Sequence, residues 1–232
     1  ADLYHQGVLR IPEGVTLVWP DNGAGIIRDN GKAQPGDGIY YHTAMLNNRA
    51  NQLSEMVNPG RIYNEVLRFV RAGATSFFLV NVSDVRPVPL STDCAMKLVW
   101  DAKPFLDKTD EENMTDFLRD WSRRQFGTDL SGTIASNYRE YFDISYMRRN
   151  VLEGENALHT KLRRLDWQTA PLIKEGKPLT EDMLKSCGDL LTFSKQNSAY
   201  VRDLLDRARS VFPQVPGDRR DFYRSHILTQ LE

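Results

Sequence analysis

One segment of the first half of the chain limits the fold most, because a helix pattern, a glycine turn and a strand pattern follow one another directly. Asn58 can cap a helix whose first turn contains Pro59, and the helix pattern ends at Ala72-Gly73. Residues 76–82 are then rich in apolar and β-branched side chains, as in a buried strand. A helix followed at once by a buried strand is half of a βαβ unit, so the sequence predicts a parallel α/β fold.

Two further segments have the composition of strands. Residues 15–19 form a nearly continuous apolar and β-branched run, which is typical of a parallel strand buried on both faces. Residues 39–42 have the same pattern. The strand pattern is confined to residues 1–105, whereas a closed eight-stranded α/β barrel needs roughly 200 residues or more. We therefore expect either a small open sheet or one part of a barrel.

Apolar residues from Asp110 onward recur at the spacing of helices. Two predicted helix faces carry Met114, Phe117, Leu118 and Trp121, and Tyr138, Tyr141, Phe142 and Tyr146. Later helices are expected near 155–170, 181–210 and 218–231, with short connections at 171–178 and 213–217. Short connections favour antiparallel neighbours. The sequence thus predicts a parallel α/β domain over 1–105, followed by an antiparallel helical bundle domain over 106–232.

Aromatic side chains are frequent in this second half. They are Trp121, Phe126, Trp167, Phe193, Tyr200, Phe212 and Phe222. Their helical spacing favours a place in the bundle core over a ligand-binding site.

The charge balance argues against polyanionic partners. The 232 residues include 30 basic and 31 acidic side chains, giving a formal net charge of −1, and neither sign forms a long run. We therefore expect no nucleic acid and no membrane among the partners. The apolar runs also fall short of the roughly 18 to 20 residues that a membrane span requires, and the first residues lack the pattern of a secretory signal peptide.

Patterns that would indicate a cofactor or a metal are weak. The run Gly23-Ala24-Gly25 lacks the third glycine and the following helix of a dinucleotide fingerprint, and it does not match a phosphate-binding loop. The four histidines include no pair four residues apart, and Cys94 and Cys187 lack metal-ligand spacing. We expect no cofactor and no metal site, and we interpret the cysteines as structural thiols.

Polar side chains follow each of the three predicted strands. The strands end in Trp19-Pro20-Asp21-Asn22, in His42, and in Asn81-Val82-Ser83-Asp84. Functional groups of parallel α/β folds lie beyond these carboxyl ends, and carboxylates serve as acids, bases and nucleophiles in glycoside hydrolysis. Each residue also has an ordinary interpretation. Asp21 and Asp84 suit turns, and His42 suits a core position bonded to the backbone.

Several of these motifs together resemble a known family. They are Val15–Arg28, Gly36–His42, Asn58–Tyr63, Phe78–Pro87, Asp120–Gly127 and Arg220–Leu228. Their sequences and their order are similar to those of the family 115 glycoside hydrolases, the xylan α-1,2-glucuronidases. The resemblance extends over nearly the whole chain.

This resemblance implies a parent enzyme with an N-terminal α/β domain, an eight-stranded barrel, a helical bundle and a C-terminal β domain. The present chain would contain the carboxyl-terminal portion of the (β/α)8 barrel over 1–105, a partial TIM-type barrel, and the helical bundle domain over 106–232. Family members remove (methyl)glucuronic acid from xylan by a proposed inverting mechanism without a metal cofactor. The resemblance thus implies a polysaccharide or oligosaccharide substrate, a secreted or periplasmic location, and the remaining domains of the parent enzyme as partners, while a homodimer stays open.

The resemblance also implies roles for the residues at the strand ends. Asp21 and Asp84 become the active-site carboxylates. The residues expected to line the substrate site are Trp19, Asn22, Arg28, Tyr41, His42 and Asn81. Among these, Arg28 and His42 suit an anionic uronate, because a charge-assisted hydrogen bond to a carboxylate is stronger than a neutral one.

One departure from the family pattern favours an alternative function. A family acidic position corresponds to Asn64, with Glu65 one place further along the same predicted helix. An amide cannot donate the proton that a leaving group needs, and a shift of one residue turns a helical side chain by about 100°. Asn64 therefore favours the alternative of a catalytically silent carbohydrate-binding or scaffold homologue. A small free-standing α/β domain with an unrelated role is a third alternative, which requires the motif matches to be accidental.

Overall fold

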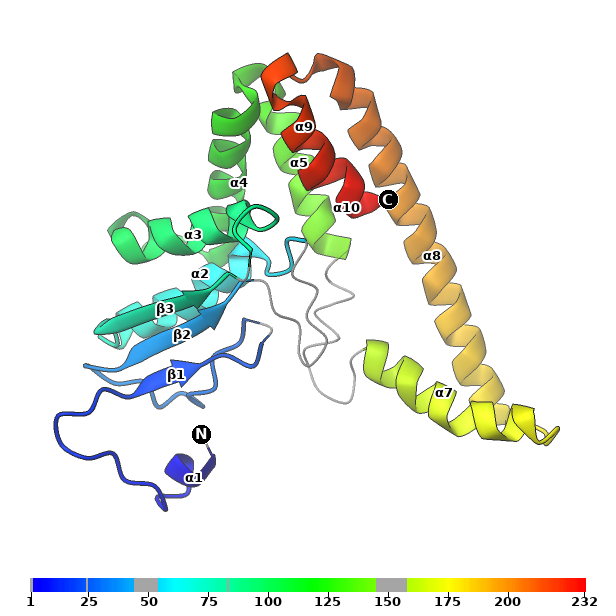
Figure 1. Cartoon of the computed structure of the whole chain (residues 1–232), viewed down its shortest axis with the longest axis horizontal. Coiled ribbons are helices and arrows are strands. Elements are labelled where there is room, and N and C mark those ends of the chain that lie inside the picture. The colour runs from blue at the N-terminus through cyan, green and yellow to red at the C-terminus, as the bar shows by residue number, and fades with distance from the viewer. Residues whose placement is uncertain (1, 24, 44–53, 83, 145–157) are drawn as a thin grey trace. The chain divides into compact units, whose positions relative to one another are not determined.

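The computed structural model describes residues 2–23, 25–43, 54–82, 84–144 and 158–232 (Figure 1). Contacts divide the chain into two compact units, Ala1–Ala135 and Ser136–Glu232. Each unit is described by itself below. After the helix that ends at Trp100, the described residues contain helices and turns but no further strand. The predicted change from mixed to helical structure near residue 105 is thus confirmed for the described residues. The division into two domains at that point stays a prediction.

The first unit is built on a small parallel sheet. Its strands are β1 (Val18–Pro20), β2 (Gly38–His42) and β3 (Phe77–Asn81). Their order is β1-β2-β3, and both neighbouring pairs are parallel. The parallel α/β prediction is thus confirmed for these strands.

The first strand is shorter than the sequence predicted. The expected strand over 15–19 buried on both faces is wrong, because Val15 is exposed and only Val18–Pro20 pair in register with β2. Leu17 still accepts a hydrogen bond at 2.8 Å from the backbone nitrogen of Gly38. The reason is the position of β1 at the edge of the sheet, where one side lacks a covering strand among the described residues.

Helix α2 (Pro59–Arg71) follows the local signals of its sequence. The Asn58 side chain accepts a hydrogen bond at 2.7 Å from the Gly60 nitrogen, which caps the first turn. At the other end Gly73 adopts a positive φ of 72°, which a residue with a Cβ atom adopts only with strain. The predicted cap and end of this helix are confirmed.

Two more helices complete the helical layer of the first unit, α3 (Pro89–Trp100) and α4 (Asp110–Phe126). Helix α2 packs against both of them. The Thr109 side chain and Glu112 form a capping box at the start of α4. The predicted apolar face of this helix is confirmed, because Met114, Phe117, Leu118 and Trp121 are all buried. Helix α4 thus packs in the same compact unit as the sheet.

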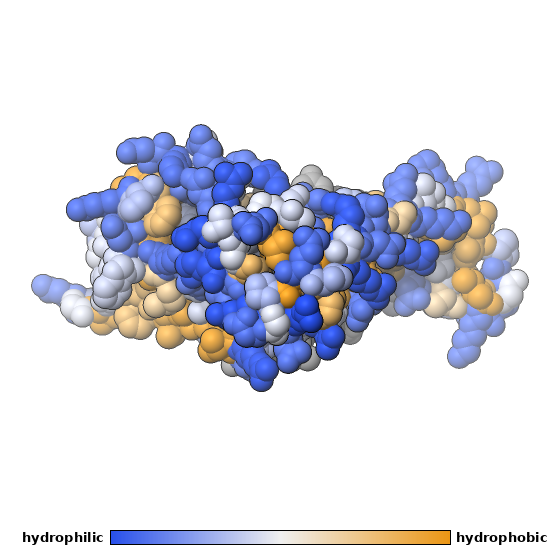
Figure 2. Space-filling model, turned by 90° about the horizontal axis from the view of Figure 1, so that it is seen from above, coloured by the Kyte–Doolittle hydropathy of each residue, from blue (hydrophilic) through white to orange (hydrophobic). Residues whose placement is uncertain are grey.

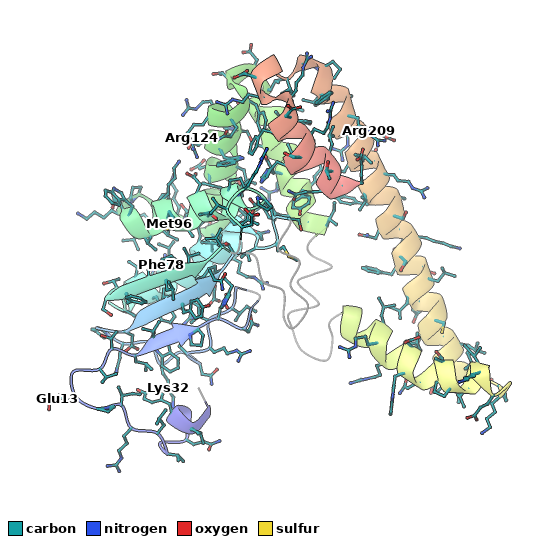
Figure 3. All side chains as sticks on the ribbon, viewed as in Figure 1. Glu13, Lys32, Phe78, Met96, Arg124 and Arg209 are labelled. Carbon is teal, nitrogen blue, oxygen red and sulfur yellow. The ribbon has the colours of Figure 1, made fainter. Side chains whose placement is uncertain are left out.

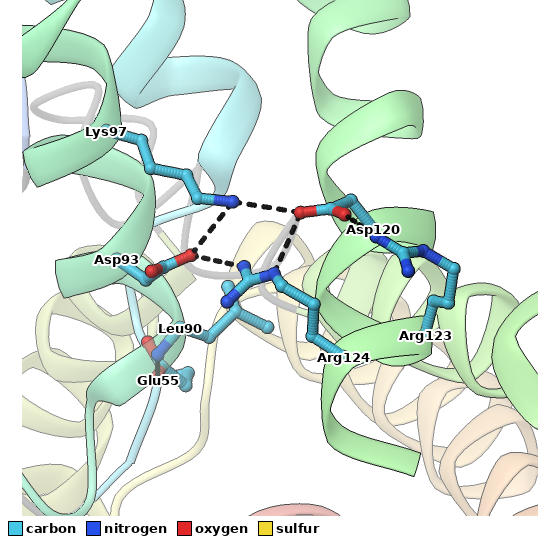
Figure 4. Close-up of polar contacts among 7 residues, drawn as sticks. All are labelled: Glu55, Leu90, Asp93, Lys97, Asp120, Arg123 and Arg124. Atoms are coloured by element: carbon cyan, nitrogen blue, oxygen red, sulfur yellow. Dashed lines mark hydrogen bonds and ion pairs between the residues drawn. The ribbon is translucent and has the colours of Figure 1, made fainter. Parts of the chain in front are cut away.

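An ion-pair network ties α3 to α4 (Figure 4). Lys97 and Arg124 each contact both Asp93 of α3 and Asp120 of α4, with nitrogen to oxygen distances of 2.6 to 3.8 Å. Arg123 adds a contact of 2.8 Å to Asp120. Burial alone would raise the pKa of Asp120, but hydrogen bonds from Lys97, Arg123 and Arg124 outweigh it and hold that pKa far below its usual range.

The remaining elements are helical. The longer helices are α5 (Thr128–Ile144), α7 (Leu158–Lys174) and α8 (Glu181–Val211). The short ones are α1 (Asp2–His5), α9 (Arg220–Tyr223) and α10 (Thr229–Leu231), with a π-helical turn at Arg224–Leu228 and 3-10 turns at Lys103–Phe105, Phe212–Gln214 and Gly217–Arg219. The predicted helices near 181–210 and 218–231 are thus confirmed as helical.

The core of the second unit contains a buried polar contact. The Tyr138 hydroxyl lies 2.8 Å from Nδ1 of His226, and the ring of Phe222 stacks on the same imidazole. The Tyr223 hydroxyl donates to the carbonyl of Ala208 on α8 at 2.9 Å. Tyr138, Tyr141 and Phe142 are buried as predicted, whereas Tyr146 lies outside the described residues.

Two expectations for the second half are wrong. Pro171 was expected in a connection, but it lies inside α7, which continues to Lys174. Trp167 and Phe193 were expected in the bundle core, but both are exposed. Figure 2 shows hydrophobic side chains at the surface at the right-hand end of the view. Within the part of the chain that the structure describes, none of the helices has both the length and the apolar character needed to cross a bilayer.

Candidate functional site

The carboxyl edge of the sheet brings three polar residues from three strands together. Asp21 follows β1, while His42 ends β2 and pairs in register with Asn81 at the end of β3. This edge is where the ligand-binding groups of parallel α/β folds lie. We therefore take it as the candidate site.

A buried carboxylate organises this edge. Oδ1 of Asp21 lies 2.7 Å from Nδ1 of His42 and accepts a hydrogen bond at 2.9 Å from the backbone nitrogen of Gly23. Its Oδ2 accepts a hydrogen bond at 2.9 Å from the backbone nitrogen of His42. The Asp21 side chain has no exposed surface. One carboxylate therefore holds both the main chain and the ring of His42, and its own oxygens are used within the protein.

The contact with Asp21 also determines which ring nitrogen of His42 carries a proton. An ionised carboxylate only accepts hydrogen bonds, so Nδ1 is the protonated nitrogen in this contact. Nε2 is then left as the acceptor of a neutral ring, or as a second donor of a charged one. Such an imidazole, held by a carboxylate on one side, can exchange a proton or bind an anion on the other.

Tyr40 is a member of this group that the sequence interpretation missed. Its ring centroid lies 4.5 Å from that of His42, and its hydroxyl accepts a hydrogen bond at 3.2 Å from Nδ2 of Asn81. Because side chains alternate between the faces of a strand, Tyr40 and His42 share one face. The sequence contained a signal for this, because the alternation places Tyr40 on the same face as His42 and Tyr41 on the opposite face.

Two of the predicted substrate-lining residues lie on the other face. Tyr41 is buried, and its hydroxyl donates to the carbonyl of Gly25 at 3.1 Å. Burial, and then the nearby charges of Asp21 and Glu65, raise the pKa of Tyr41 well above its usual value. Trp19 is buried too, and its indole nitrogen donates to Oδ2 of Asp37 at 2.8 Å. Both side chains have partners within the protein.

The loop after β1 places Asn22 and Arg28 near the end of that strand. The backbone nitrogen of Asn22 donates to the carbonyl of Ile26 at 2.9 Å, and that of Arg28 donates to the carbonyl of Pro20 at 3.0 Å. The loop thus returns along β1, with the Arg28 side chain exposed. Asn22 is partly exposed beside Asp21.

Asp84 lies in an exposed turn. Its Oδ1 accepts a hydrogen bond at 3.2 Å from the backbone nitrogen of Arg86 two residues later. This geometry is that of an Asx turn, which aspartate forms in many loops. The hydrogen bonds described for Asp21 and for Asp84 share no partner, so the structure does not join the two predicted carboxylates into one hydrogen-bonded group.

Asn64, the departure from the family pattern, forms a hydrogen bond with helix α4. Nδ2 of Asn64 donates to Oδ2 of Asp110 at the start of α4 at 2.8 Å. Oε2 of Glu65 accepts a hydrogen bond from the backbone nitrogen of Ile27 at 3.0 Å and forms an ion pair with Arg68 at 2.8 Å. A carboxylate in place of Asn64 would face Asp110, a like charge. The described hydrogen bond of the amide at position 64 is therefore to Asp110 and not to Asp21 or His42.

Glu55 is a second residue that the sequence interpretation missed. It is fully buried, and its oxygens accept hydrogen bonds from the backbone nitrogens of Leu90 at 2.7 Å and Ser91 at 3.2 Å, and from the Ser91 hydroxyl. Figure 4 draws Glu55 beside Leu90. These nitrogens belong to the first turn of α3, whose own N-cap residue, Val88, provides no side-chain acceptor. The missing cap at Val88-Pro89 was the only signal in the sequence.

The described residues hold no cluster of three or more histidine, cysteine or acidic side chains suited to a metal ion. A cavity of about 360 Å³ lies at the amino-terminal end of the strands, between residues 14–17, which precede β1, and residues 34–37, which precede β2. The chemistry available at the carboxyl edge is therefore that of His42, with Asn81 and Tyr40 as hydrogen-bonding neighbours.

Comparisons with known proteins place the chain in a family. A solved structure of a family GH115 4-O-methyl-alpha-glucuronidase, with specificity for decorated arabinogalactans, matches with a TM-score of 0.69 and 22% identity, over 99% of this chain and 28% of that chain. The present chain thus spans less than a third of its length. No curated protein matches. The family model described as Glycosyl hydrolase family 115 matches residues 1–152. The resemblance seen in the motifs is confirmed, and the chain belongs to glycosyl hydrolase family 115.

Proposed function

We propose that the carboxyl edge of the sheet is part of the active site of a glycoside hydrolase that removes a glucuronic acid or 4-O-methylglucuronic acid side chain from a polysaccharide or oligosaccharide. The observation that carries this proposal is the buried contact between Asp21 and His42 at the end of parallel strands. Family membership supports the reaction class. The solved relative, named as a 4-O-methyl-alpha-glucuronidase, supports the sugar, and its specificity for decorated arabinogalactans leaves the polysaccharide open between that class and xylan.

In this proposal His42 binds the uronate carboxylate. A ring that donates Nδ1–H to Asp21 presents Nε2 to a ligand, and when charged it forms a charge-assisted hydrogen bond with the anion. Asn81 and Tyr40 contribute neutral hydrogen bonds to sugar hydroxyls, and Asn22 and Arg28 lie on the loop beside them. Trp19 and Tyr41 support the sheet from its other face.

The predicted catalytic carboxylates receive different roles. Asp21 is buried and accepts hydrogen bonds from three donors of the protein, so we propose that it is a positioning residue that acts through His42. Asp84 is exposed and keeps its candidate role as an acid or base. Inverting hydrolysis uses two carboxylates, and a second one would come from another part of the enzyme.

The architecture proposed for this enzyme is a (β/α)8 barrel, of which the present strands are one part, followed by a helical bundle. The strand order β1-β2-β3 with α2 packed against α3 supports it, because successive units then advance around the sheet in one direction. The remaining domains would be covalent partners. The secreted or periplasmic location and a homodimer stay predictions.

A catalytically silent carbohydrate-binding homologue is the second candidate. The observation that favours it is the burial of Asp21, which leaves Asp84 as the predicted carboxylate that is exposed. Asn64, which the sequence interpretation used for the same argument, contacts Asp110 instead. Both candidates bind a sugar at the carboxyl edge of the sheet, and they differ only in whether the glycosidic bond is hydrolysed.

Titration of the purified chain with glucuronic acid, followed through the backbone amide resonances of Tyr40, Tyr41 and Asn81, tests sugar binding at the carboxyl edge of the sheet. We expect saturable shifts with glucuronic acid, no saturation with xylose, and loss of binding in His42→Gln, which keeps a similar size but cannot carry the charge. Equal responses to both sugars, or unchanged binding in His42→Gln, would contradict the proposal. Release of glucuronic acid by the complete enzyme then separates the hydrolase from the silent homologue.

A further inference from the structure

Residues 25–29, called here the return segment, alternate between buried and exposed positions. Gly25, Ile27 and Asp29 are buried. Arg28, which lies between the last two, is exposed. A period of two is that of an extended chain, and Ile27 pairs with Asp21 in an isolated antiparallel bridge. The return segment therefore runs back along the end of β1 with one side buried and with Arg28 on the exposed side.

Helix α2 lies against the buried side of the return segment. Arg61, Glu65 and Arg68 are spaced by four and by three residues, so they share one side of the helix. One helical turn rises about 5.4 Å and two residues of extended chain rise about 6.6 Å, so the two repeats stay matched over this distance. The contacts follow in order along both elements: Gly25 lies beside Arg61, Ile27 beside Glu65 and Asp29 beside Arg68.

Charged groups make two of these three contacts. Oε2 of Glu65 accepts hydrogen bonds from the backbone nitrogen of Ile27 at 3.0 Å and from Arg68 at 2.8 Å. Arg68 also donates to Oδ2 of Asp29 at 2.6 Å, and the same oxygen accepts a hydrogen bond from the Ala33 nitrogen at 3.2 Å. Burial alone would lower the pKa of Arg68, but hydrogen bonds to Asp29 and Glu65 outweigh it and raise that pKa. A charged guanidinium thus links α2 to the return segment directly and through Glu65.

Backbone contacts hold the two ends of the return segment. The Gly25 carbonyl accepts a hydrogen bond from the Tyr41 hydroxyl at 3.1 Å. Gly25 has a φ of 76°, and a Cβ atom there would lie 2.7 Å from that hydroxyl oxygen and 2.9 Å from Cγ1 of Val57. Glycine therefore permits this close approach. At the other end Lys32, labelled in Figure 3, donates its backbone N–H to the carbonyl of Asp29 at 3.0 Å.

These contacts fix the register of the return segment, and the register decides where Arg28 lies. Because side chains alternate along an extended chain, a shift by one residue would turn Arg28 toward α2 and Ile27 outward. In the observed register the Arg28 nitrogen donates to the carbonyl of Pro20 at 3.0 Å, opposite the end of β1. Arg28 thus depends on α2 for its place at the carboxyl edge of the sheet.

We propose that Glu65 and Arg68 are positioning residues of the sugar site, which hold the return segment in the register that presents Arg28 to the carboxylate of a uronic acid. Both act through Arg28 and make no contact with the sugar. This inference deepens the proposed function and rests on it for the identity of the ligand. It makes the preference for an acidic over a neutral sugar depend on two residues of α2.

Hydrogen exchange of the purified chain tests the holding contacts without any sugar. We expect the amides of Ile27 and Ala33 to exchange at least about tenfold faster in Arg68→Met, which removes the charge. Arg68→Lys keeps the charge but not the forked contact, so it should show a smaller increase, and it replaces Arg68→Met if that variant does not fold. Arg71→Met is the matched control, because Arg71 lies on the same helix and donates to the Leu106 carbonyl instead. Unchanged exchange in the Arg68 variants, or an equal increase in Arg71→Met, overturns the proposal.

Titration with glucuronic acid, read from the amides of Tyr40 and Asn81, tests whether the effect passes through Arg28. We expect Arg68→Met and Arg28→Gln each to raise Kd about tenfold, and the double variant to raise it no further, because no charge is then left to position. Glu65→Gln, which keeps an acceptor but not the ion pair, should give an intermediate Kd. A rise of about a hundredfold in the double variant would mean independent effects and contradict the proposal, as would an unchanged Kd in Arg68→Met.

The two proposals fail separately. If the unmodified chain does not bind glucuronic acid, the proposed function is wrong, and the role of Glu65 and Arg68 in sugar binding is wrong with it. Hydrogen exchange still decides in that case whether they hold the return segment. If the unmodified chain binds glucuronic acid and Arg68→Met binds it equally well, the proposed function stands and the positioning role is wrong.

Discussion

His42 is the residue whose environment defines the candidate site. Its main-chain nitrogen and its ring both contact one buried carboxylate, that of Asp21. The sequence predicted that both residues lie at strand ends, because a polar side chain after a buried strand is a local pattern. It did not predict the contact between them, because this contact depends on the β1–β2 register, which brings residues 21 positions apart together. Asp21 therefore changes from a predicted acid to a proposed positioning residue.

Replacing Asp21 tests this change of role. In Asp21→Asn the new amide group carries two donors where the carboxylate had only acceptors, so one backbone or ring donor is left buried without a partner. We expect a loss of about 1–3 kcal/mol in the free energy of unfolding and a change in the His42 tautomer. Urea unfolding and nitrogen NMR of the imidazole measure the two effects.

Asp84→Asn is the matched control for that experiment. Asparagine forms the same kind of turn, and the residue is exposed, so we expect a change within about 0.5 kcal/mol. Equal losses in the two variants would mean that the buried contacts of Asp21 are not what stabilises this edge.

At the scale of elements, helix signals were easier to read than strand signals. The cap at Asn58, the end at Gly73 and the apolar face of α4 depend on residues within a few positions, and all three are confirmed. The limits and burial of β1 depend on partners elsewhere in the chain, and a strand at a sheet edge buries less than its composition suggests. Pro171 was misread for a related reason, since its effect inside α7 depends on context.

The cap of α3 gives a prediction at this scale. Glu55→Ala removes the acceptor of the Leu90 and Ser91 backbone nitrogens, which are buried. We expect a loss of about 1–3 kcal/mol in the free energy of unfolding, the combined range for a lost helix cap and an unsatisfied buried donor. Glu175→Ala, at an exposed ion pair with Lys177, is the control and should change stability by less than about 0.5 kcal/mol. Similar losses in both would argue against the cap.

The network between α3 and α4 gives a prediction for acid. The pKa of Asp120 is lower in the folded chain than in the unfolded chain, so its contribution to stability is present above the unfolded value, near pH 4, and is lost as the pH falls through the lower folded value. Asp120→Asn should therefore reduce stability at neutral pH and flatten its decline below pH 4. Unfolding curves from about pH 2 to pH 7 measure this, and an unchanged slope in the variant would contradict it. Partial exposure keeps the effect small.

At the scale of the whole molecule, the family, the small parallel sheet and the helical second half were all predicted from the sequence. Several separate motifs in the same order carried the family, so it did not depend on any single residue. The assignment of strand ends to one edge followed from parallel topology. Tyr40 and Glu55 were missed because their roles depend on which face and which helix end they reach.

The proposed division of the active site between parts of the enzyme predicts the behaviour of the isolated chain. The described acids provide one exposed candidate, Asp84, at the strand ends, and inverting hydrolysis needs two. We therefore expect the purified 232-residue chain to release no glucuronic acid from glucuronoxylan or from a decorated arabinogalactan. Chromatography of the released sugar measures this, with the complete enzyme as the positive control. Release at a normal enzymatic rate would show that the second acid lies within this chain.

The contact between Glu55 and the start of α3 also has a dynamic consequence. Glu55 lies 35 residues before Leu90 in the chain, so the segment Ser54–Val57 cannot move away without releasing the first turn of the helix. The two pieces should open together as one cooperative unit, with a common free energy of opening in native-state exchange. Since α3 also carries Asp93 and Lys97, which form ion pairs with α4, opening of the segment Ser54–Val57 should also weaken the contact between α3 and α4.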